Sequence, residues 1–342
     1  MAAITGISSL TLAQIRGLQT ADITATSSTE WSKLSTAQVT AMSTAQVAAI
    51  SSSGVTGLAT SVIQAMSVDQ VFSLITDQVA ALSTRQVQAL TSVQVAKLTT
   101  AQIVALSSDQ FQAMETQDLA ALTSGQVAAI ETEDLVALTT QQVMAMTALQ
   151  LRAMTTGQME ALSSAQVKSL QSAQIAALSS QQVRAIETSD LVVMTTDQVV
   201  ALTTALIKNL TSEQLAALTT SQTKALTAAQ VKSLSTDQIV TLTSNQVKSL
   251  TSTQLAALST DQVAAFETED VAALSTVQIN AVSAAQFKAL TTGQIAALDS
   301  NQAKALGTAQ IAATAAVINT TYDDVATNDV LTVDCDGAGT GT

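Results

Sequence analysis

An eight-residue repeat is the feature that most constrains how this 342-residue chain can fold. Residues 10–313 divide into 38 octads without an insertion or deletion, and typical octads read LSTAQVTA, LTTAQIVA and LTSGQVAA. Positions 1 and 6 are apolar in almost every octad, and position 5 is Gln in 29 octads and Asp or Glu in six more. A repeat this short predicts one small unit stacked many times, with positions 1 and 6 in a shared core.

The octad has the pattern of a helix start. Leu at position 1, Ser or Thr at 2, Gln at 5 and Val at 6 fit the N′, N-cap, N3 and N4 places of a capping box with a hydrophobic staple. Where position 2 lacks a hydroxyl, position 3 is Ser or Thr, and we expect that residue to provide the cap. Acidic residues gather at positions 2 to 5 and basic residues at position 7, as a helix dipole favours. Each octad therefore predicts a capped helix of under two turns that needs its neighbours for stability.

The repeat period decides how these helices are joined. One continuous helix is excluded because eight residues advance about 80° beyond two turns, which would wind the apolar stripe around the helix. Position 7 is polar in 11 of the 13 octads found at every third place from Leu10, and far less often in the other two sets. We predict an all-α solenoid of 38 short capped helices, three to each 24-residue coil. A β-solenoid is the alternative, although strict polar–apolar alternation is missing.

The ends of the chain depart from the repeat. Residues 1–9 form an N-terminal lead, and residues 10–313 form the solenoid, with residues 10–65 partly degenerate. Residues 314–342 lose the octad register. Their VLTV segment predicts a strand, and their Gly/Thr-rich end predicts a loose tail.

Composition excludes several classes of function. The chain has no His and a single Cys, Cys335, so the usual general base, a disulfide framework and a cysteine zinc site are all missing. We therefore expect a protein that is not an enzyme. A net charge of −13 disfavours binding to nucleic acid, and no apolar run has the roughly 18 residues of a membrane span. The N-terminal residues also lack a signal-peptide pattern.

Paired carboxylates are the candidate binding groups. Four octads carry Glu at position 2 and Asp at position 5, namely Glu115 with Asp118, Glu131 with Asp134, Glu187 with Asp190, and Glu267 with Asp270. Carboxylates three residues apart can share Ca²⁺, but acids are also favoured at a helix N-terminus without any ligand. Asp334 and Asp336 resemble half of a calcium loop. We assign no cofactor or catalytic residue, and calcium at these carboxylates is the alternative.

The L-[ST]-x-x-Q-V-x-A octad resembles the low-complexity tandem repeats of large surface and extracellular proteins of Gram-negative bacteria, including haem-utilisation or adhesion proteins and nanofilament subunits. This resemblance implies secretion and a fibrous or adhesive role, whereas the missing His argues against haem ligation. We expect a structural subunit of an extracellular or cell-surface filament, exported without an N-terminal signal peptide. Its partners would be further copies of itself, stacked head to tail. The alternative is an adhesin or a solenoid that binds glycan or ice.

Overall fold

The computed structural model describes residues 3–323, and this part of the chain is helical with no strand. The prediction of an all-α solenoid is confirmed, and the β-solenoid alternative is wrong. The chain divides into two compact units, Met1–Leu210 and Thr211–Thr342. None of the described helices has both the length and the apolar character that crossing a bilayer requires.

The helices of the first unit are a three-residue 3₁₀-helix and, after it, α-helices of four to six residues that follow the octads one by one. They are the 3₁₀-helix η1 (Ile7–Ser9) and the α-helices α1 (Leu12–Arg16), α2 (Thr20–Thr24), α3 (Ser28–Trp31), α4 (Thr36–Ala41), α5 (Thr44–Ala48), α6 (Ser52–Val55), α7 (Thr60–Ala65), α8 (Val68–Phe72), α9 (Thr76–Ala81), α10 (Thr84–Gln88), α11 (Ser92–Val95), α12 (Thr100–Val104), α13 (Ser108–Ala113), α14 (Thr116–Ala121), α15 (Ser124–Ala128), α16 (Thr132–Ala137), α17 (Thr140–Ala145), α18 (Ala148–Ala153), α19 (Thr156–Ala161), α20 (Ser164–Ser169), α21 (Ser172–Ala177), α22 (Ser180–Ala185), α23 (Thr188–Val193), α24 (Thr196–Ala201) and α25 (Thr204–Ile207).

The second unit continues the pattern and ends in one long helix. Its helices are α26 (Ser212–Ala217), α27 (Thr220–Ala225), α28 (Ala228–Ser233), α29 (Thr236–Val240), α30 (Ser244–Ser249), α31 (Ser252–Ala257), α32 (Thr260–Ala264), α33 (Thr268–Ala273), α34 (Thr276–Ala281), α35 (Ala284–Lys288), α36 (Thr292–Ala296), α37 (Ser300–Lys304) and α38 (Thr308–Asp323).

The predicted capping box is present at the start of most of these helices. At α20, the amide of Gln166 donates to the Ser163 hydroxyl at 3.4 Å, and the Ser163 amide donates to Gln166 Oε1 at 2.9 Å. These two bonds satisfy amides that have no partner inside the helix. Because a helix this short consists almost entirely of its two ends, the cap supplies a large part of its hydrogen bonding.

One detail of the capping prediction is wrong. Where position 2 lacks a hydroxyl, the residue at position 3 does not become the cap. Helix α14 begins at Thr116, and its N-cap is still Glu115, whose side chain makes no cap bond. The extended backbone at position 2 fixes the helix start in every octad, so Thr116 lies at the first helical position with its hydroxyl past the place of a cap.

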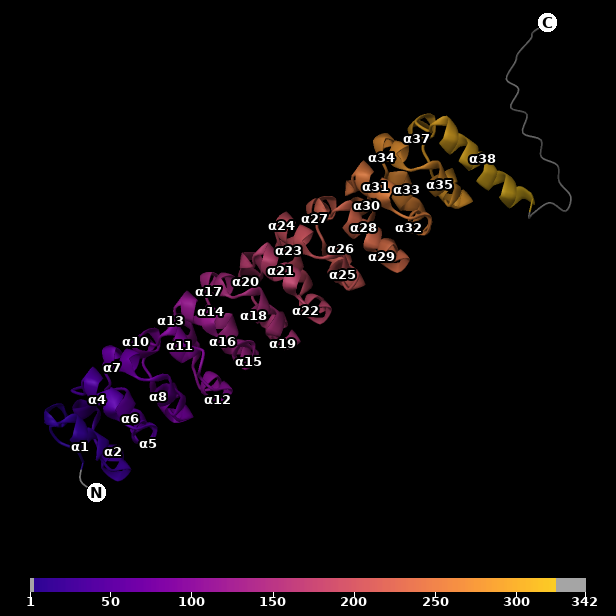
Figure 1. The fold of residues 1–342 in the computed structure, drawn as a ribbon. Coiled ribbons are helices and arrows are strands. Elements are labelled where there is room, and N and C mark those ends of the chain that lie inside the picture. Colours follow the sequence, from indigo (N-terminus) through magenta and orange to yellow (C-terminus); the bar gives the residue numbers. More distant parts are fainter. Residues whose placement is uncertain (1–2, 324–342) are drawn as a thin grey trace, which may run out of the picture. The chain divides into compact units, whose positions relative to one another are not determined.

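Within each unit, a helix packs against the helix three places later along the chain. Examples are α18 against α21 in the first unit and α28 against α31 in the second (Figure 1). This pattern confirms the coil of three helices in 24 residues. Side chains at position 6, such as Ile103 and Phe111, are fully buried between successive coils, and those at position 1, such as Leu106, are nearly so.

The N-terminal lead behaves as an incomplete octad. Helix η1 packs on α3, and its Ile7 is fully buried at the place of a position-6 side chain. The Ile7 amide donates to the Glu30 carboxylate at 3.1 Å, and Gln38 Nε2 donates to the Ile7 carbonyl at 2.8 Å. Residues 1–9 are therefore not only a lead, because residues 7–9 already belong to the coil geometry.

In the degenerate octads between residues 10 and 65, one unusually large side chain packs against an unusually small residue of the next coil. Trp31 occupies position 6 of its octad and is fully buried. Three octads later, Gly54 replaces the usual Gln, and a Cβ atom at Gly54 would lie 2.8 Å from Trp31 Cδ1. The indole thus fills space that a glutamine side chain takes in other coils. Helices α3 and α6 also approach closely at Gly57, where a Cβ atom would lie 2.2 Å from the Ser28 carbonyl oxygen.

At the other end, α38 runs for 16 residues, past the last octad. The prediction of a strand-like, loose segment after residue 313 is wrong for residues 314–323, which continue this helix. The octad that would begin at Thr314 has Ala315 and Ala316 at positions 2 and 3 and Ile318 at position 5, so it lacks the hydroxyl and the Gln that would start a new helix. The VLTV segment lies outside the described residues.

Candidate functional site

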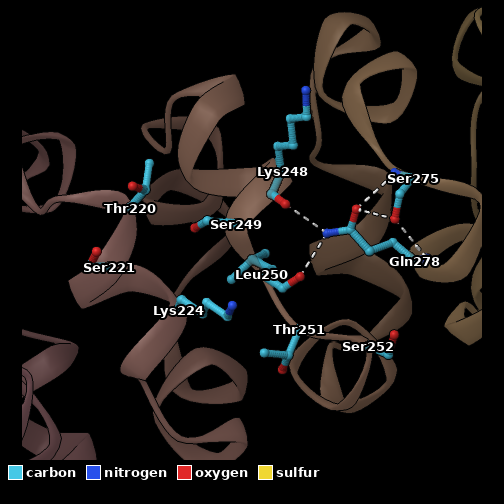
Figure 2. Close-up of a pocket in the computed structure, with 10 residues that line it drawn as sticks. All are labelled: Thr220, Ser221, Lys224, Lys248, Ser249, Leu250, Thr251, Ser252, Ser275 and Gln278. Carbon is cyan, nitrogen blue, oxygen red and sulfur yellow. Dashed lines mark hydrogen bonds between the residues drawn. The ribbon is translucent and has the colours of Figure 1, made fainter.

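The glutamines at position 5 form the dominant polar system of the fold, and 28 of the 29 are buried. Figure 2 shows one of them, Gln278 of α34. Its Oε1 accepts from the Ser275 amide and hydroxyl, both at 2.8 Å. Its Nε2 donates to the carbonyl oxygens of Lys248, at 3.0 Å, and Leu250, at 2.7 Å. One amide therefore joins the start of its own helix to the junction between α30 and α31 in the coil before it.

The same bonds recur with fixed spacing along each unit, and we call the series the glutamine ladder. Gln158 Nε2 donates to the carbonyls of Val127, at 2.9 Å, and Ile130, at 2.7 Å, which lie 31 and 28 residues earlier. Gln286 repeats this with Leu255 and Leu258 at 3.0 and 2.8 Å. The Val127 carbonyl also accepts from the Ile130 amide at 3.2 Å, whereas the Ile130 carbonyl lies past the end of the helix, where the glutamine supplies a donor.

We call each position-5 residue of the ladder, with its hydrogen bonds, a rung. In the four predicted carboxylate pairs, the aspartate takes the place of the glutamine and forms a modified rung. The buried Asp118 accepts a hydrogen bond from the Ser92 hydroxyl at 2.6 Å, and Asp134 accepts one from Ser108, also at 2.6 Å. Asp190 is bonded in the same way to Ser164. A carboxylate has no N–H to donate, so it cannot replace the glutamine amide, and a serine 26 residues earlier donates to it instead.

The fourth rung is less complete. Asp270 Oδ2 accepts from the Glu267 amide at 3.1 Å, whereas its buried Oδ1 has no hydrogen-bond partner among the described residues. Ser244 stands 26 residues earlier, so all four of these aspartates share the Ser–Asp spacing in the sequence. This relation was not predicted from the sequence. The spacing of 26 residues equals one 24-residue coil plus two residues, so it has meaning only once the length of the coil is known.

Burial raises the pKa of two of these aspartates. It raises the pKa of Asp118, the Ser92 hydroxyl opposes that shift, and the negative charge of Glu115 adds to it. Burial likewise raises the pKa of Asp270, against the lowering effect of Ser244 and the Glu267 amide. A raised pKa is the expected result of moving a carboxylate into a core with a single neutral donor.

The two carboxylates of a pair do not share one environment. Asp118 is buried, whereas Glu115 is exposed and accepts from Gln117 Nε2 at 2.8 Å. Asp134 is buried and Glu131 is exposed in the same manner. Nowhere in residues 3–323 do three or more His, Cys, Asp or Glu side chains come together as a metal site requires. Asp334 and Asp336 lie outside the described residues, as does Cys335.

Open grooves follow the corners at which one helix ends and the next begins. The groove in Figure 2 has a volume of about 490 Å³ and is lined by hydroxyls, the Gln278 amide and two lysines, Lys224 and Lys248. The side chains of the two lysines run in different directions. A groove in the first unit is lined from nearly the same octad positions, with Gln64 and Gln88 in place of the lysines. These grooves are therefore a product of the coil geometry, and their chemistry varies with the residue at position 7.

The fold and its ladder define a class: a solenoid repeat protein built from three-helix coils of octads. The sequence profile of the ALTTAQ repeat family matches the chain in ten overlapping segments, residues 84–116, 111–148, 127–164, 156–185, 167–204, 183–220, 207–244, 220–252, 236–266 and 263–300. Together they cover residues 84–300, more than half of the chain, so the protein belongs to the ALTTAQ repeat family. No curated protein matches it significantly.

Proposed function

We propose that this protein is a structural subunit that joins end to end with further copies of itself to form an extracellular filament. The observation that supports this function is the burial pattern at the two ends of the repeat. Position-1 side chains are buried through the inner coils, but Leu10 and Leu18 in the first coil are half-buried. Position-6 side chains are buried in the same way, but Ile295 is half-buried and Ile311 is 53% exposed near the other end.

These exposures are a consequence of the stacking. A position-6 side chain is covered by the coil that follows it, so the last coils leave theirs open. Position-1 side chains are half-buried at both ends, Leu10 and Leu18 in the first coil and Leu298 and Leu306 near the other end. Solenoids commonly end in capping repeats with a polar outer face, whereas apolar groups remain open at both of these ends. A contact between two different ends does not close on itself, so repetition of it gives a filament.

The remaining surface suits a protein that associates only at its ends. The exposed positions 2 to 4 and 7 carry mostly Ser, Thr, Gln and charged residues, and the net charge is −13. Like charge along the sides of neighbouring filaments disfavours lateral aggregation. The extracellular location is part of the proposal and is supported by the resemblance of the octad to repeats of bacterial surface proteins.

Electron microscopy and sedimentation velocity over a concentration series test this function. We expect filaments, and a mass-average sedimentation coefficient that rises with concentration. An Ile311→Glu variant places a charge at the apolar C-terminal end of the repeat and should shift assembly to higher concentration. Phe72→Glu is the matched control, because Phe72 is 57% exposed at position 7 on the side of the first unit. A protein that stays monomeric at every concentration tested would refute the proposal.

A further inference from the structure

We propose that the end-to-end contact continues the solenoid in register, with Gln14 of one copy serving as the next rung of the glutamine ladder of the copy before it. This inference rests on the filament proposed above and specifies its interface. The occupant of each open end is therefore a second copy of this chain.

Gln14 is the one position-5 glutamine that is not buried in the described part of the chain. Its Oε1 accepts from the Thr11 amide at 2.8 Å, as in every capping box. Among residues 3–323, no acceptor is bonded to its Nε2. Four octads later, Gln46 Nε2 already has its carbonyl partners, Ile15 and Leu18, both at 2.9 Å. The Oε1 of Gln14 is therefore bonded as in the other glutamines of the ladder, whereas its Nε2 lacks the carbonyl acceptors that theirs have.

The other end of the repeat has the complementary gap. One coil below the end, Gln302 Nε2 donates to the carbonyls of Val271, at 3.2 Å, and Leu274, at 2.6 Å. The carbonyls of Ile295 and Leu298 hold the same octad positions one coil further on. The residue that would donate to both stands at position 326, and it is an alanine, which has no side-chain donor.

The three-place packing of the helices brings these two gaps together. Helix η1 occupies the place of an octad before α1, because it packs on α3 and its Ile7 carbonyl accepts from Gln38 in the same way as the later rungs. Because a helix packs on the helix three places before it, a second copy that continues the coils beyond α38 sets its η1 on α36, which α38 also contacts, its α1 on α37 and its α2 on α38.

In this register, Gln14 of the second copy stands 31 positions after Ile295 and 28 after Leu298 of the first. Most glutamines of the ladder use these two offsets, as Gln158 does with Val127 and Ile130, whereas Gln278 and Gln294 reach acceptors 30 and 28 residues earlier. The same register brings the half-buried Leu10 and Leu18 against the half-buried Ile295 and Leu306. The interface then repeats the coil–coil contact already present inside the chain.

Cross-linking tests the register separately from assembly. In a Cys335→Ser background, Arg16→Cys and Lys304→Cys put thiols at exposed position-7 sites that the proposed register stacks on one face, one coil apart. A bis-maleimide with a spacer of about 10 Å spans packed helices. We expect a ladder of covalent dimers, trimers and longer species under denaturing conditions. The matched control pairs Arg16→Cys with Lys288→Cys, which is also exposed at position 7 but lies on a different face, and should give little ladder.

Filaments whose Arg16–Lys304 pair does not cross-link, or cross-links no better than the control pair, would overturn the register and leave the proposed function standing. Absence of any assembly in sedimentation would overturn both. The two failures are therefore distinguishable.

A substitution tests the rung itself. Gln14→Glu keeps the acceptor of the capping box and removes the N–H donor, so α1 should fold unchanged by circular dichroism. We expect the concentration needed for assembly at pH 7 to rise about tenfold or more, since two hydrogen bonds are lost and a carboxylate faces two carbonyls. The control Gln64→Glu makes the same charge change at an exposed position-7 site and should leave assembly within about twofold. Equal effects of the two variants would overturn the role of Gln14.

Discussion

Removal of one internal rung should destabilise the first unit out of proportion to the size of the change. Gln166 is 2% exposed, and its Oε1 accepts from the Ser163 amide at 2.9 Å. Its Nε2 donates to the carbonyls of Leu135 and Leu138, both at 2.9 Å. A Gln166→Leu substitution keeps the volume nearly constant and removes all three bonds, leaving the Ser163 amide and the Leu138 carbonyl without this partner, while the Leu135 carbonyl keeps the Leu138 amide at 3.2 Å.

The magnitude follows from those three bonds. A buried hydrogen bond contributes about 1 kcal/mol, and a buried partner left unsatisfied costs about 1–3 kcal/mol. We expect Gln166→Leu to lower the free energy of unfolding by about 3–4 kcal/mol, allowing for some access of water at the helix junction. Gln166→Glu keeps the acceptor and loses the donors, and burial would raise the pKa of the new carboxyl. Its cost should therefore be largest at pH 7 and shrink as the pH falls and the carboxyl gains a proton that it can donate.

Urea unfolding followed by circular dichroism measures the total change, and hydrogen exchange of peptides from residues 127–170 shows where protection is lost. The second measurement is needed because repeat arrays open locally as well as globally. Gln64→Leu and Gln64→Glu are the controls, since Gln64 is exposed at position 7 and its side chain makes no rung. The reasoning would be refuted if the variants at the two sites lost similar stability, or if Gln166→Glu were insensitive to pH.

The modified rungs and the glycines give three further predictions. Ser92→Ala should lower stability by about 2 kcal/mol at pH 7, because it removes the donor to a buried carboxylate, and by much less in an Asp118→Gln background; a double-mutant cycle in urea measures the difference. Because burial raises the pKa of Asp270, the stability that this group contributes is present below its usual pKa and is lost as the pH rises through the raised value. Asp270→Asn should therefore be more stable than the parent protein at pH 7 and equal to it near pH 3 in thermal melts. Gly57→Ala should cost about 3 kcal/mol because its Cβ would overlap a carbonyl of α3, whereas Gly125→Ala, which meets nothing within 4 Å, should gain about 0.5–1 kcal/mol.

Local patterns in the sequence predicted the individual helices well. The Ser or Thr at position 2 and the Gln at position 5 specify each helix start within one octad, so no long-range information is needed to place α20 or α34. The same locality explains the error at α14. The sequence offers Thr116 as a substitute cap, but the backbone conformation that starts the helix is set by the whole octad and stays at Glu115.

The second role of the glutamine was harder to predict because it depends on two chain segments at once. The Nε2 of Gln158 finds its acceptors 28 and 31 residues earlier, and those numbers have meaning only once the 24-residue coil is known. The Ser92–Asp118 pair is hidden for the same reason. Once the 24-residue coil is known, the sequence does indicate this pair, since a serine stands 26 residues before each of the four aspartates.

The ladder also determines how stability is distributed along the repeat. A helix of four to six residues has no interior in which its hydrogen bonds are all satisfied, so it depends on the cap at its start and on a glutamine from the following coil at its end. Within each unit, the inner coils are thus stabilised from both sides. The first coil contributes a Gln14 with an unused donor, and near the other end the carbonyls of Ile295 and Leu298 receive no glutamine among residues 3–323. Amide protection should therefore be highest in the middle of each unit, and it should rise at Ile295 and Leu298 only when a second copy supplies the missing donor.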